Sequence, residues 1–287
     1  MSLSRPSYLM HFLQEMGMRP QKKWSQNFLV DGNIIRKIVH AAGAEKGDLI
    51  LEIGPGPGAL TEALLAQGCS VAAVEKDPGF ADALMRLEKE PGTLSVFKED
   101  ILDFPIEKFL QEKCKGGKKV KVVSNLPYHI TTPIALKLLP LHAWIESITI
   151  MVQREVALRI CAKQGSSDYS SLSLFTQFYC SPHYCFTVPP TCFFPQPKVH
   201  SAVVTMNLKE PPLPLEKEEA FFKITRTAFQ HRRKMLRSSL KELYSKEVIA
   251  SCLAKLNIEE ARPEELSLDQ FLLLFNELSR STGKLPD

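Results

Sequence analysis

The chain has 287 residues, of which 44% are hydrophobic and 24% charged, and its formal net charge at pH 7 is +4. This length allows a substantial core, in one large domain or in one domain with a small companion. No apolar run approaches the roughly 20 residues of a membrane-spanning helix. The first residues lack the apolar core of a secretory signal. We therefore expect no membrane partner, while an organellar presequence stays open because no acidic residue precedes Glu15.

The N-terminal segment has the apolar spacing of a short helix. Leu9, Phe12, Leu13 and Met16 recur at i, i+3, i+4 and i+7, which places them on one helical face. This pattern predicts an N-terminal helical extension over residues 1–20.

From Asp48 to about Leu208, short apolar runs alternate with helix-like stretches. Such alternation predicts a parallel sheet covered by helices on both faces, that is, a Rossmann-like α/β domain over residues 21–207. The Pro-rich segment 188–199 is expected to be a stiff, extended connection. The expected strands are DLILEI (48–53), SVAAVE (70–75), LSVFKED (94–100), VKVVSN (120–125), SITIMVQ (147–153), SLFTQFYC (173–180), HYCFTV (183–188) and SAVVTMNL (201–208).

The composition changes at LKEPPLPLEKEE, which we predict to be a linker over residues 208–219. The remainder, 220–287, is expected to form a small helical domain. Within FFKITRTAFQHRRKMLRSSLKELY (221–244) we expect one helix with a buried stripe and, beside it, a basic band that suits a phosphate backbone. The stripe comprises Phe229, Leu236, Leu240 and Leu243, and the band comprises Arg226, Arg233, Arg237 and Lys241.

The glycine-rich segment LILEIGPGPGALT predicts a tight strand-to-helix turn that approaches a ligand closely. Gly54, Gly56 and Ala59 also satisfy the GxGxxA form of the dinucleotide fingerprint, with Glu75 at the end of the next strand. Both NAD enzymes and methyltransferases use such an acid for ribose hydroxyls, so these residues alone leave two cofactors open.

Three acids at the ends of successive expected strands favour S-adenosylmethionine. Glu52 would oppose a pyrophosphate but suits a ligand with an amino group and a sulfonium, and Asp100 can accept from an adenine amine. Pro55 and Pro57 remove backbone N–H donors that a phosphate-binding loop needs.

The motif NLPY follows the fourth expected strand and suits a chemical step on adenine. The lone pair of the exocyclic amine is delocalised, and two acceptors for its N–H groups help to free it. Asn125 can offer its side-chain oxygen and Leu126 its backbone carbonyl, while Pro127 stiffens the turn. Tyr128 offers a flat face for an extruded base. Methyl transfer from a sulfonium then needs positioning rather than a strong base.

Together these motifs resemble those of the ribosomal RNA adenine dimethyltransferases. The resemblance includes WSQNFLVD (24–31), the ExGxGxG turn, NLPY, VPPTCFFPQPKVHSAV (188–203) and AFQHRRKMLRSSL (228–240). It is greatest for the small-subunit branch, which converts two adjacent adenosines near the 3′ end of 16S rRNA to dimethyladenosine. The resemblance implies a class I S-adenosylmethionine-dependent methyltransferase domain and a role in small-subunit maturation.

The resemblance also implies site residues. Asn27, Leu29, Gly54 and Gly56 would contact the cofactor, Glu75 its ribose and Asp100 its adenine. Asn125 would lie between cofactor and target base, with Leu126 beside it. Phe193 would oppose Tyr128 across the flipped adenine, although Phe194 adjoins it and could take that place. The basic stretch with Arg232, Arg233, Lys234 and Arg237 would bind rRNA in a pre-ribosomal particle.

Three positions depart from the family pattern, namely Ser25, the Gln230–His231 pair and His200, and none lies in the expected chemistry. The alternatives are a large-subunit rRNA adenine methyltransferase of the antibiotic-resistance type, a non-enzymatic ribosome-assembly factor and, more remotely, an NAD-dependent enzyme.

Seven cysteines without a CxxC pair indicate reduced thiols in the cytoplasm. Cys180, His183, Cys185 and Cys192 fit no standard zinc module, so we expect no metal. Nothing in the sequence requires more than a monomer.

Overall fold

The structure is a computed structural model that describes residues 3–19 and 27–283. It divides into two compact units, which we describe separately. The first comprises residues 1–157 and 181–209, and the second comprises residues 158–180 and 210–287. The boundary at residue 157 falls inside α7 (Arg154–Cys161).

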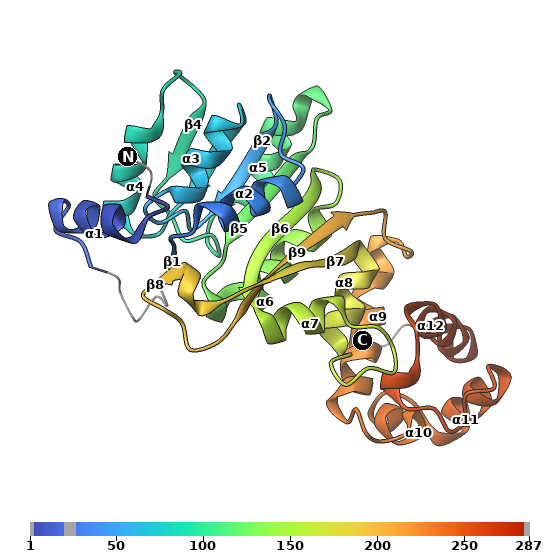
Figure 1. The fold of residues 1–287 in the computed structure, drawn as a ribbon. Coiled ribbons are helices and arrows are strands. Elements are labelled where there is room, and N and C mark those ends of the chain that lie inside the picture. The colour runs from blue at the N-terminus through green and yellow to red at the C-terminus, as the bar shows by residue number, and fades with distance from the viewer. Residues whose placement is uncertain (1–2, 20–26, 284–287) are drawn as a thin grey trace. The chain divides into compact units, whose positions relative to one another are not determined.

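The first unit is built on a seven-stranded sheet (Figure 1). Its strand order is β4-β3-β2-β5-β6-β9-β7; β2 to β6 run parallel, and β9 is antiparallel to β6. Antiparallel β9 lies between β6 and β7, which sets the sheet apart from the six-stranded dinucleotide-binding order. The strands are β2 (Leu49–Ile53), β3 (Ser70–Val74), β4 (Leu94–Phe97), β5 (Val120–Asn125), β6 (Ile145–Gln153), β7 (Cys180–Val188) and β9 (Ser201–Leu208).

Helices cover both faces of this sheet (Figure 1). Right-handed crossovers place α3 and α4 on one face, whereas the chain's return from β4 to β5 places α5 and α6 on the other. The strand order therefore reverses between β2 and β5, the point at which α/β sheets bind ligands. The helices are α2 (Gly32–Ala41), α3 (Ala59–Ala66), α4 (Pro78–Leu84), α5 (Ile106–Lys113) and α6 (Thr131–Leu138).

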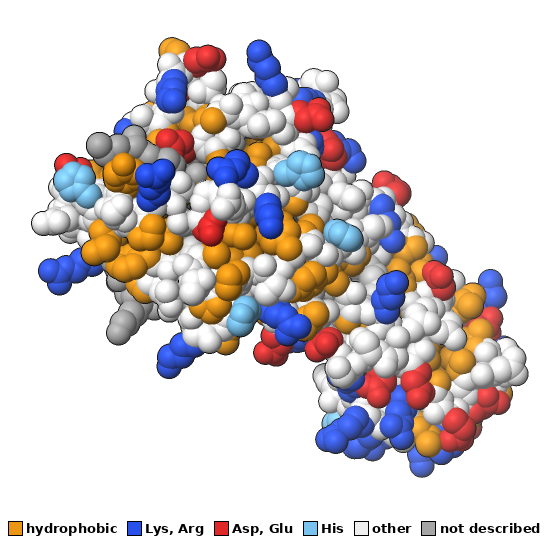
Figure 2. Space-filling view, viewed as in Figure 1, with side chains coloured by type: hydrophobic (Ala, Val, Ile, Leu, Met, Phe, Trp, Pro, Cys, Tyr) orange, Lys and Arg blue, Asp and Glu red, His pale blue; other side chains and the backbone are white. Residues whose placement is uncertain are grey.

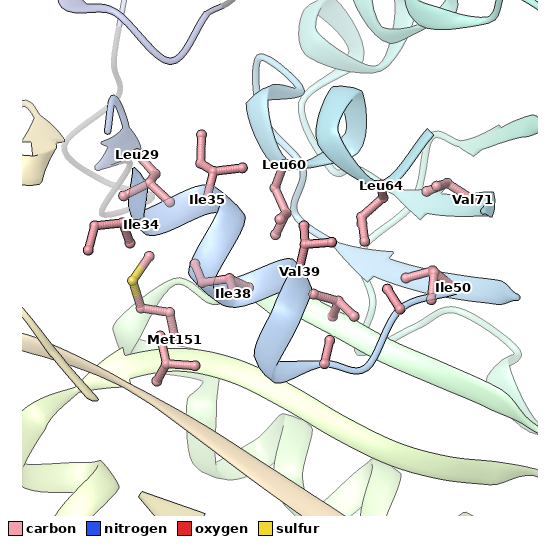
Figure 3. Packing of buried hydrophobic residues seen from close by; sticks show 14 of the residues in the cluster. Leu29, Ile34, Ile35, Ile38, Val39, Ile50, Leu60, Leu64, Val71 and Met151 are labelled. Atoms are coloured by element: carbon pink, nitrogen blue, oxygen red, sulfur yellow. The ribbon is translucent and has the colours of Figure 1, made fainter. Parts of the chain in front are cut away.

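The core on the α3 face is formed by aliphatic side chains from α2, α3 and the sheet (Figure 3). Ile38 of α2 and Leu64 of α3 are fully buried among residues such as Ile50 and Met151. Asp31 caps α2 by accepting from the backbone N–H groups of Asn33 and Ile34. The spacing of the isoleucines then turns one face of α2 onto the sheet.

The N-terminal helix α1 (Pro6–Glu15) has the expected apolar face at Leu9, Phe12 and Leu13, whereas Met16 follows the helix and is exposed. Leu9 and Leu13 are buried against a small cluster that includes Phe28 and Phe80, whose rings meet edge to face. Phe28 lies in β1 (Phe28–Leu29), which pairs antiparallel with β8 (Phe193–Phe194). This ribbon brings together two segments about 165 residues apart in sequence.

The second unit is helical. It contains α8 (Ser171–Tyr179), α9 (Leu215–Gln230), α10 (Leu236–Ser239), α11 (Lys246–Lys255) and α12 (Leu268–Thr282). Aromatic rings form much of its interior: Phe178 stacks on Phe221, which meets Phe275 edge to face. The buried Tyr179 hydroxyl donates to Glu218.

Three sequence expectations about this region were wrong. SLFTQFYC forms most of helix α8 rather than a strand, because Ser170 and Ser173 form a capping box and Leu174 and Phe178 share a buried face. The expected linker 208–219 is shorter, since α9 begins at Leu215. The helix expected over 221–244 ends at Gln230, so the basic band along one helix does not form.

Among the described residues, no helix is long and apolar enough to cross a membrane. Within the same ranges, no group of three or more His, Cys, Asp or Glu side chains is arranged to hold a metal ion.

Candidate active site

A cavity opens at the carboxyl ends of β2, β3 and β5, where the strand order reverses. Most of its lining comes from the motifs singled out in the sequence. Leu3 and Leu9 from the N-terminal segment add an apolar wall. The motif residues that line it are Asn27, Phe28, Leu29, Glu52, Gly54, Gly56, Glu75, Asp100, Asn125, Leu126, Pro127 and Tyr128.

The glycine turn follows β2 directly and requires its glycines. Gly54 and Gly56 have φ of +62° and +54°, the left-handed region that side chains rarely adopt. A Cβ at Gly56 would also come within 3.1 Å of the Phe28 ring. Arg86 holds the turn from outside by donating to the carbonyl of Pro57 at 2.6 Å, while its guanidinium lies over the Phe12 ring of α1.

Glu52 is a buried acid that faces this cavity. Its side chain is 1% exposed, and Oε2 has no hydrogen-bond partner within the described chain. Burial raises the pKa of Glu52 to about 8, and the neighbouring charge of Glu75 adds to the rise. A buried acid with one unsatisfied oxygen in a cavity is unfavourable for folding alone, so it indicates a ligand with a positive or donor group.

Glu75 follows β3 and accepts two backbone hydrogen bonds. Its Oε2 accepts from Gly56 N at 2.9 Å and its Oε1 from Asp77 N at 2.8 Å. Burial nevertheless raises the pKa of Glu75. This carboxylate therefore joins the end of β3 to the glycine turn and fixes both at the cavity.

Asp100 begins a turn after β4 that is held by charge. Its Oδ2 pairs with Lys76 Nζ at 2.6 Å, and its Oδ1 accepts from Leu102 N at 3.0 Å. Partial burial alone would raise the pKa of Asp100, but the bonds from Lys76 and Leu102 outweigh it and hold the pKa below its ordinary value. Asp100 is thus an ionised acceptor at the cavity.

The NLPY segment leaves β5 with its first residues fixed. The Ser124 hydroxyl donates to Ile53 O across the strand reversal, and Leu126 N donates to Met151 O. Asn125 Nδ2 donates to the backbone carbonyl of Asn27 at 3.2 Å. Because a carbonyl can only accept, this contact orients the amide so that Asn125 Oδ1 is the atom left for a donor on a ligand.

The two expected stacking aromatics differ in exposure. Tyr128 is half-buried and lines the cavity, and its hydroxyl lies 2.7 Å from Ser201 Oγ. Phe193 is only 2% exposed and packs in the core on the α3 face. Phe194 is half-buried and packs on the N-terminal cluster. Neither Phe193 nor Phe194 lines the cavity in this structure, so the second stacking residue stays a prediction.

The basic stretch lies in the helical unit, in the turn between α9 and α10. Arg233 and Lys234 are exposed, and Arg237 forms an exposed ion pair with Glu260 at 3.2 Å. Arg232 instead donates to the Glu264 carboxylate and to the carbonyls of Ser166 and Ser167, which fixes the turn. Figure 2 shows Lys and Arg side chains close to Asp and Glu side chains on this unit.

Sequence reasoning missed several contributors. Lys76 and Leu3, which line the cavity, and Arg86, which donates to Pro57 O of the glycine turn, belong to no motif, and only the fold brings them to these places. Leu9 was expected on a helical face, but its place in the cavity wall was not. Trp24, Ser25 and Gln26 of the WSQNFLVD segment lie outside the described residues.

The sheet, the glycine turn and the acids at successive strand ends define a Rossmann-like class I methyltransferase. A solved dimethyladenosine transferase from Plasmodium falciparum matches 89% of this chain and 98% of its own, with a TM-score of 0.77 and 25% identity. The 23S rRNA methyltransferase ErmE matches 88% of this chain and 100% of its own, with a TM-score of 0.68 and 26% identity.

A family model described as ribosomal RNA adenine dimethylase matches residues 17–280, and the chain belongs to this family. It is 50% identical to the ribosomal RNA small subunit methyltransferase A of Protochlamydia amoebophila, over 98% of this chain and 99% of that protein. It is 49% identical to the protein of the same name from Chlamydia caviae, over 97% and 99%. The expected family and fold class are thus confirmed.

Proposed function

We propose that this chain is an rRNA (adenine-N6,N6-)-dimethyltransferase that uses S-adenosylmethionine to methylate two adjacent adenosines near the 3′ end of small-subunit rRNA. The observation that carries the proposal is the juxtaposition, in one cavity, of NLPY with acids from three strand ends. The relatives that match nearly the full chain are small-subunit enzymes by name, which favours that substrate over large-subunit rRNA.

The acidic groups of the cavity fit this cofactor. The ionised Asp100 would accept from an adenine amine, and Glu75 would accept from ribose hydroxyls. Glu52, whose Oε2 has no partner within the described chain, would accept from the amino group of the methionine part. The remaining parts of the cofactor would contact Gly54, Gly56, Asn27 and Leu29. The bound cofactor would supply an electrophilic methyl group on a sulfonium.

The residues of NLPY would activate and place the target amine. With its NH₂ directed to Asn27 O, Asn125 can accept from the adenine N6 with Oδ1, and the Leu126 carbonyl can accept the second N–H. Tyr128 would stack on the flipped base, fixed by Ser201. Phe193 would need to leave the core to oppose it. Positioning and hydrogen bonding, rather than a general base, would then carry catalysis.

The helical unit would supply the grip on rRNA, as the family resemblance implies. Arg233, Lys234 and Arg237 are exposed in or next to one turn and are available to phosphates. Arg232, expected to bind RNA, would support them by fixing the turn. The functional boundaries 21–207 and 220–287 stay predictions, and so do the monomeric state and the cytoplasmic location.

The test is methyl transfer from labelled S-adenosylmethionine to small ribosomal subunits that lack adenine dimethylation, with large-subunit rRNA in parallel and nucleoside analysis of both. We expect dimethyladenosine in the small subunit alone. Label in large-subunit rRNA alone would establish the resistance-type activity. A protein that binds S-adenosylhomocysteine but labels neither RNA would be an assembly factor rather than an enzyme. A protein that binds NAD instead of S-adenosylhomocysteine would refute the proposed cofactor.

An Asn125→Ala variant tests the catalytic assignment. It should lose methyl transfer, while its affinity for rRNA stays close to that of the wild-type protein. Asn207→Ala is the matched control, because Asn207 is exposed on β9, pairs with Ser147 near the amino end of β6 and does not line the cavity. Equal loss of transfer and rRNA binding in Asn125→Ala would contradict the role assigned to Asn125.

A further inference from the structure

Lys137 makes an unusual set of contacts for a lysine without a catalytic motif. It lies on α6, in the helix that follows NLPY, and its side chain is half-buried. Its Nζ donates to three backbone carbonyls, those of Ile101 at 2.9 Å, Leu102 at 2.6 Å and Phe104 at 3.0 Å. An ammonium has three donors, so these contacts use its full capacity.

All three carbonyls belong to the turn that begins at Asp100. The amides of Asp103 and Phe104 donate back to Asp100 O, at 3.0 and 2.8 Å, and Leu102 N donates to the Asp100 carboxylate. The turn thus resembles one helical turn with Asp100 at its start. Lys137 binds the carbonyl end, where a positive charge is favourable.

Two other contacts hold this turn, at its far end and at its solvent side. Phe104 anchors the turn's far end in a cluster with the rings of Phe97 and Phe109. Lys76 binds the Asp100 carboxylate from the solvent side, and this lysine side chain is 58% exposed. Lys137 adds hydrogen bonds that join the carbonyl side of the turn to α6, the helix that follows NLPY.

We propose that Lys137 is a positioning residue that holds the Asp100 turn in the geometry for the adenine end of the cofactor. Because α6 begins at Thr131, one short turn after NLPY, Lys137 links the adenine-binding turn to the segment that would place the target base. Its positive charge favours the ionised form of Asp100 as well. The inference rests on the proposed function, since it assumes that the cavity binds S-adenosylmethionine.

The test uses Lys137→Met, which keeps a long apolar stem and removes all three donors. We expect the Kd for S-adenosylhomocysteine, measured by calorimetry without RNA, to rise about tenfold to a hundredfold. This is the effect of one charge-assisted bond rather than three, because Lys137 acts on the cofactor only through the turn. At saturating cofactor, kcat on small subunits should change less than threefold. Lys137→Arg should restore part of the affinity.

Lys119→Met is the matched control, because Lys119 Nζ also donates to a backbone carbonyl, that of His142, at 2.8 Å, but away from the cavity. It should leave cofactor affinity unchanged. Unchanged affinity of Lys137→Met for S-adenosylhomocysteine, whether or not kcat falls, would overturn the inference. A wild-type protein that binds no S-adenosylhomocysteine would instead refute the proposed function.

Discussion

Replacing Glu52 with glutamine should make the free protein more stable at neutral pH. Glu52 is 1% exposed, its Oε2 has no partner within the described chain, and burial raises its pKa from the ordinary value of 4.5 to about 8. The folded state therefore binds this proton more tightly than the unfolded chain does. Stability from this group is complete below pH 4.5 and is lost as pH rises toward 8.

At pH 7 the unfolded chain ionises Glu52 while the folded protein largely keeps it protonated, and this difference lowers the free energy of unfolding by about 3 kcal/mol relative to low pH. Glutamine has the same shape and carries no charge, so Glu52→Gln should recover about 1–3 kcal/mol once its own amide burial is allowed for. The same change should weaken binding of S-adenosylmethionine, because the acid that faces its amino group is gone. An acid kept at a functional site at the expense of stability is a common pattern.

The assay is urea unfolding of both proteins, without cofactor, at pH 5, 7 and 8.5. Glu75 also has a raised pKa, so the difference between variant and wild type, rather than either curve alone, isolates Glu52. The stabilisation by Glu52→Gln should be small at pH 5 and should grow toward pH 8. A variant that is less stable at every pH, or a difference that is independent of pH, would refute the reasoning.

Three further predictions concern the base and the RNA. Tyr128→Ala should lower kcat/KM for the small subunit about tenfold to a hundredfold through lost stacking, whereas Tyr128→Phe, which loses only the bond to Ser201, should retain most activity. Arg233→Gln combined with Arg237→Gln should weaken rRNA binding and reduce the slope of log K against log salt by roughly 0.7–0.9 per lost phosphate contact, with cofactor affinity unchanged. Arg232→Met should lower the free energy of unfolding by about 1–2 kcal/mol in urea titrations, because its internal hydrogen bonds are lost. An Arg232 variant of full stability with reduced RNA affinity would show direct contact instead.

The sequence was most informative where local chemistry alone determines structure. Near-continuous apolar runs that are rich in β-branched residues, such as Ile148–Val152, favour strands buried on both faces. Glycine is favoured at positions 54 and 56, where φ is positive. Acids placed directly after such strands meet at one edge of a parallel sheet. That edge of the cavity was therefore predictable without coordinates.

The predictions from sequence were wrong where a short apolar segment can form either a strand or a helix. SLFTQFYC is short and rich in aromatic residues, as strands are, yet Leu174 and Phe178 share a helical face, and burial in the helical unit selects the helix. The helix expected over 221–244 carries no proline or glycine, and it ends at Gln230 because Arg232 is held by Glu264 and by loop carbonyls distant in sequence. The helix propensity of a segment carries no information about contacts with residues distant in sequence.

The sequence by itself determined the chemistry of this protein: a glycine turn, acids at strand ends and an amide before Pro127 and Tyr128. Only the tertiary structure decided how those groups are held, as Lys137 reaches a turn more than 30 residues away and Asn27 O orients the Asn125 amide. The physical reason is that side-chain identity sets what a group can bind. Its orientation depends on hydrogen bonds and packing from residues that adjoin it only after folding.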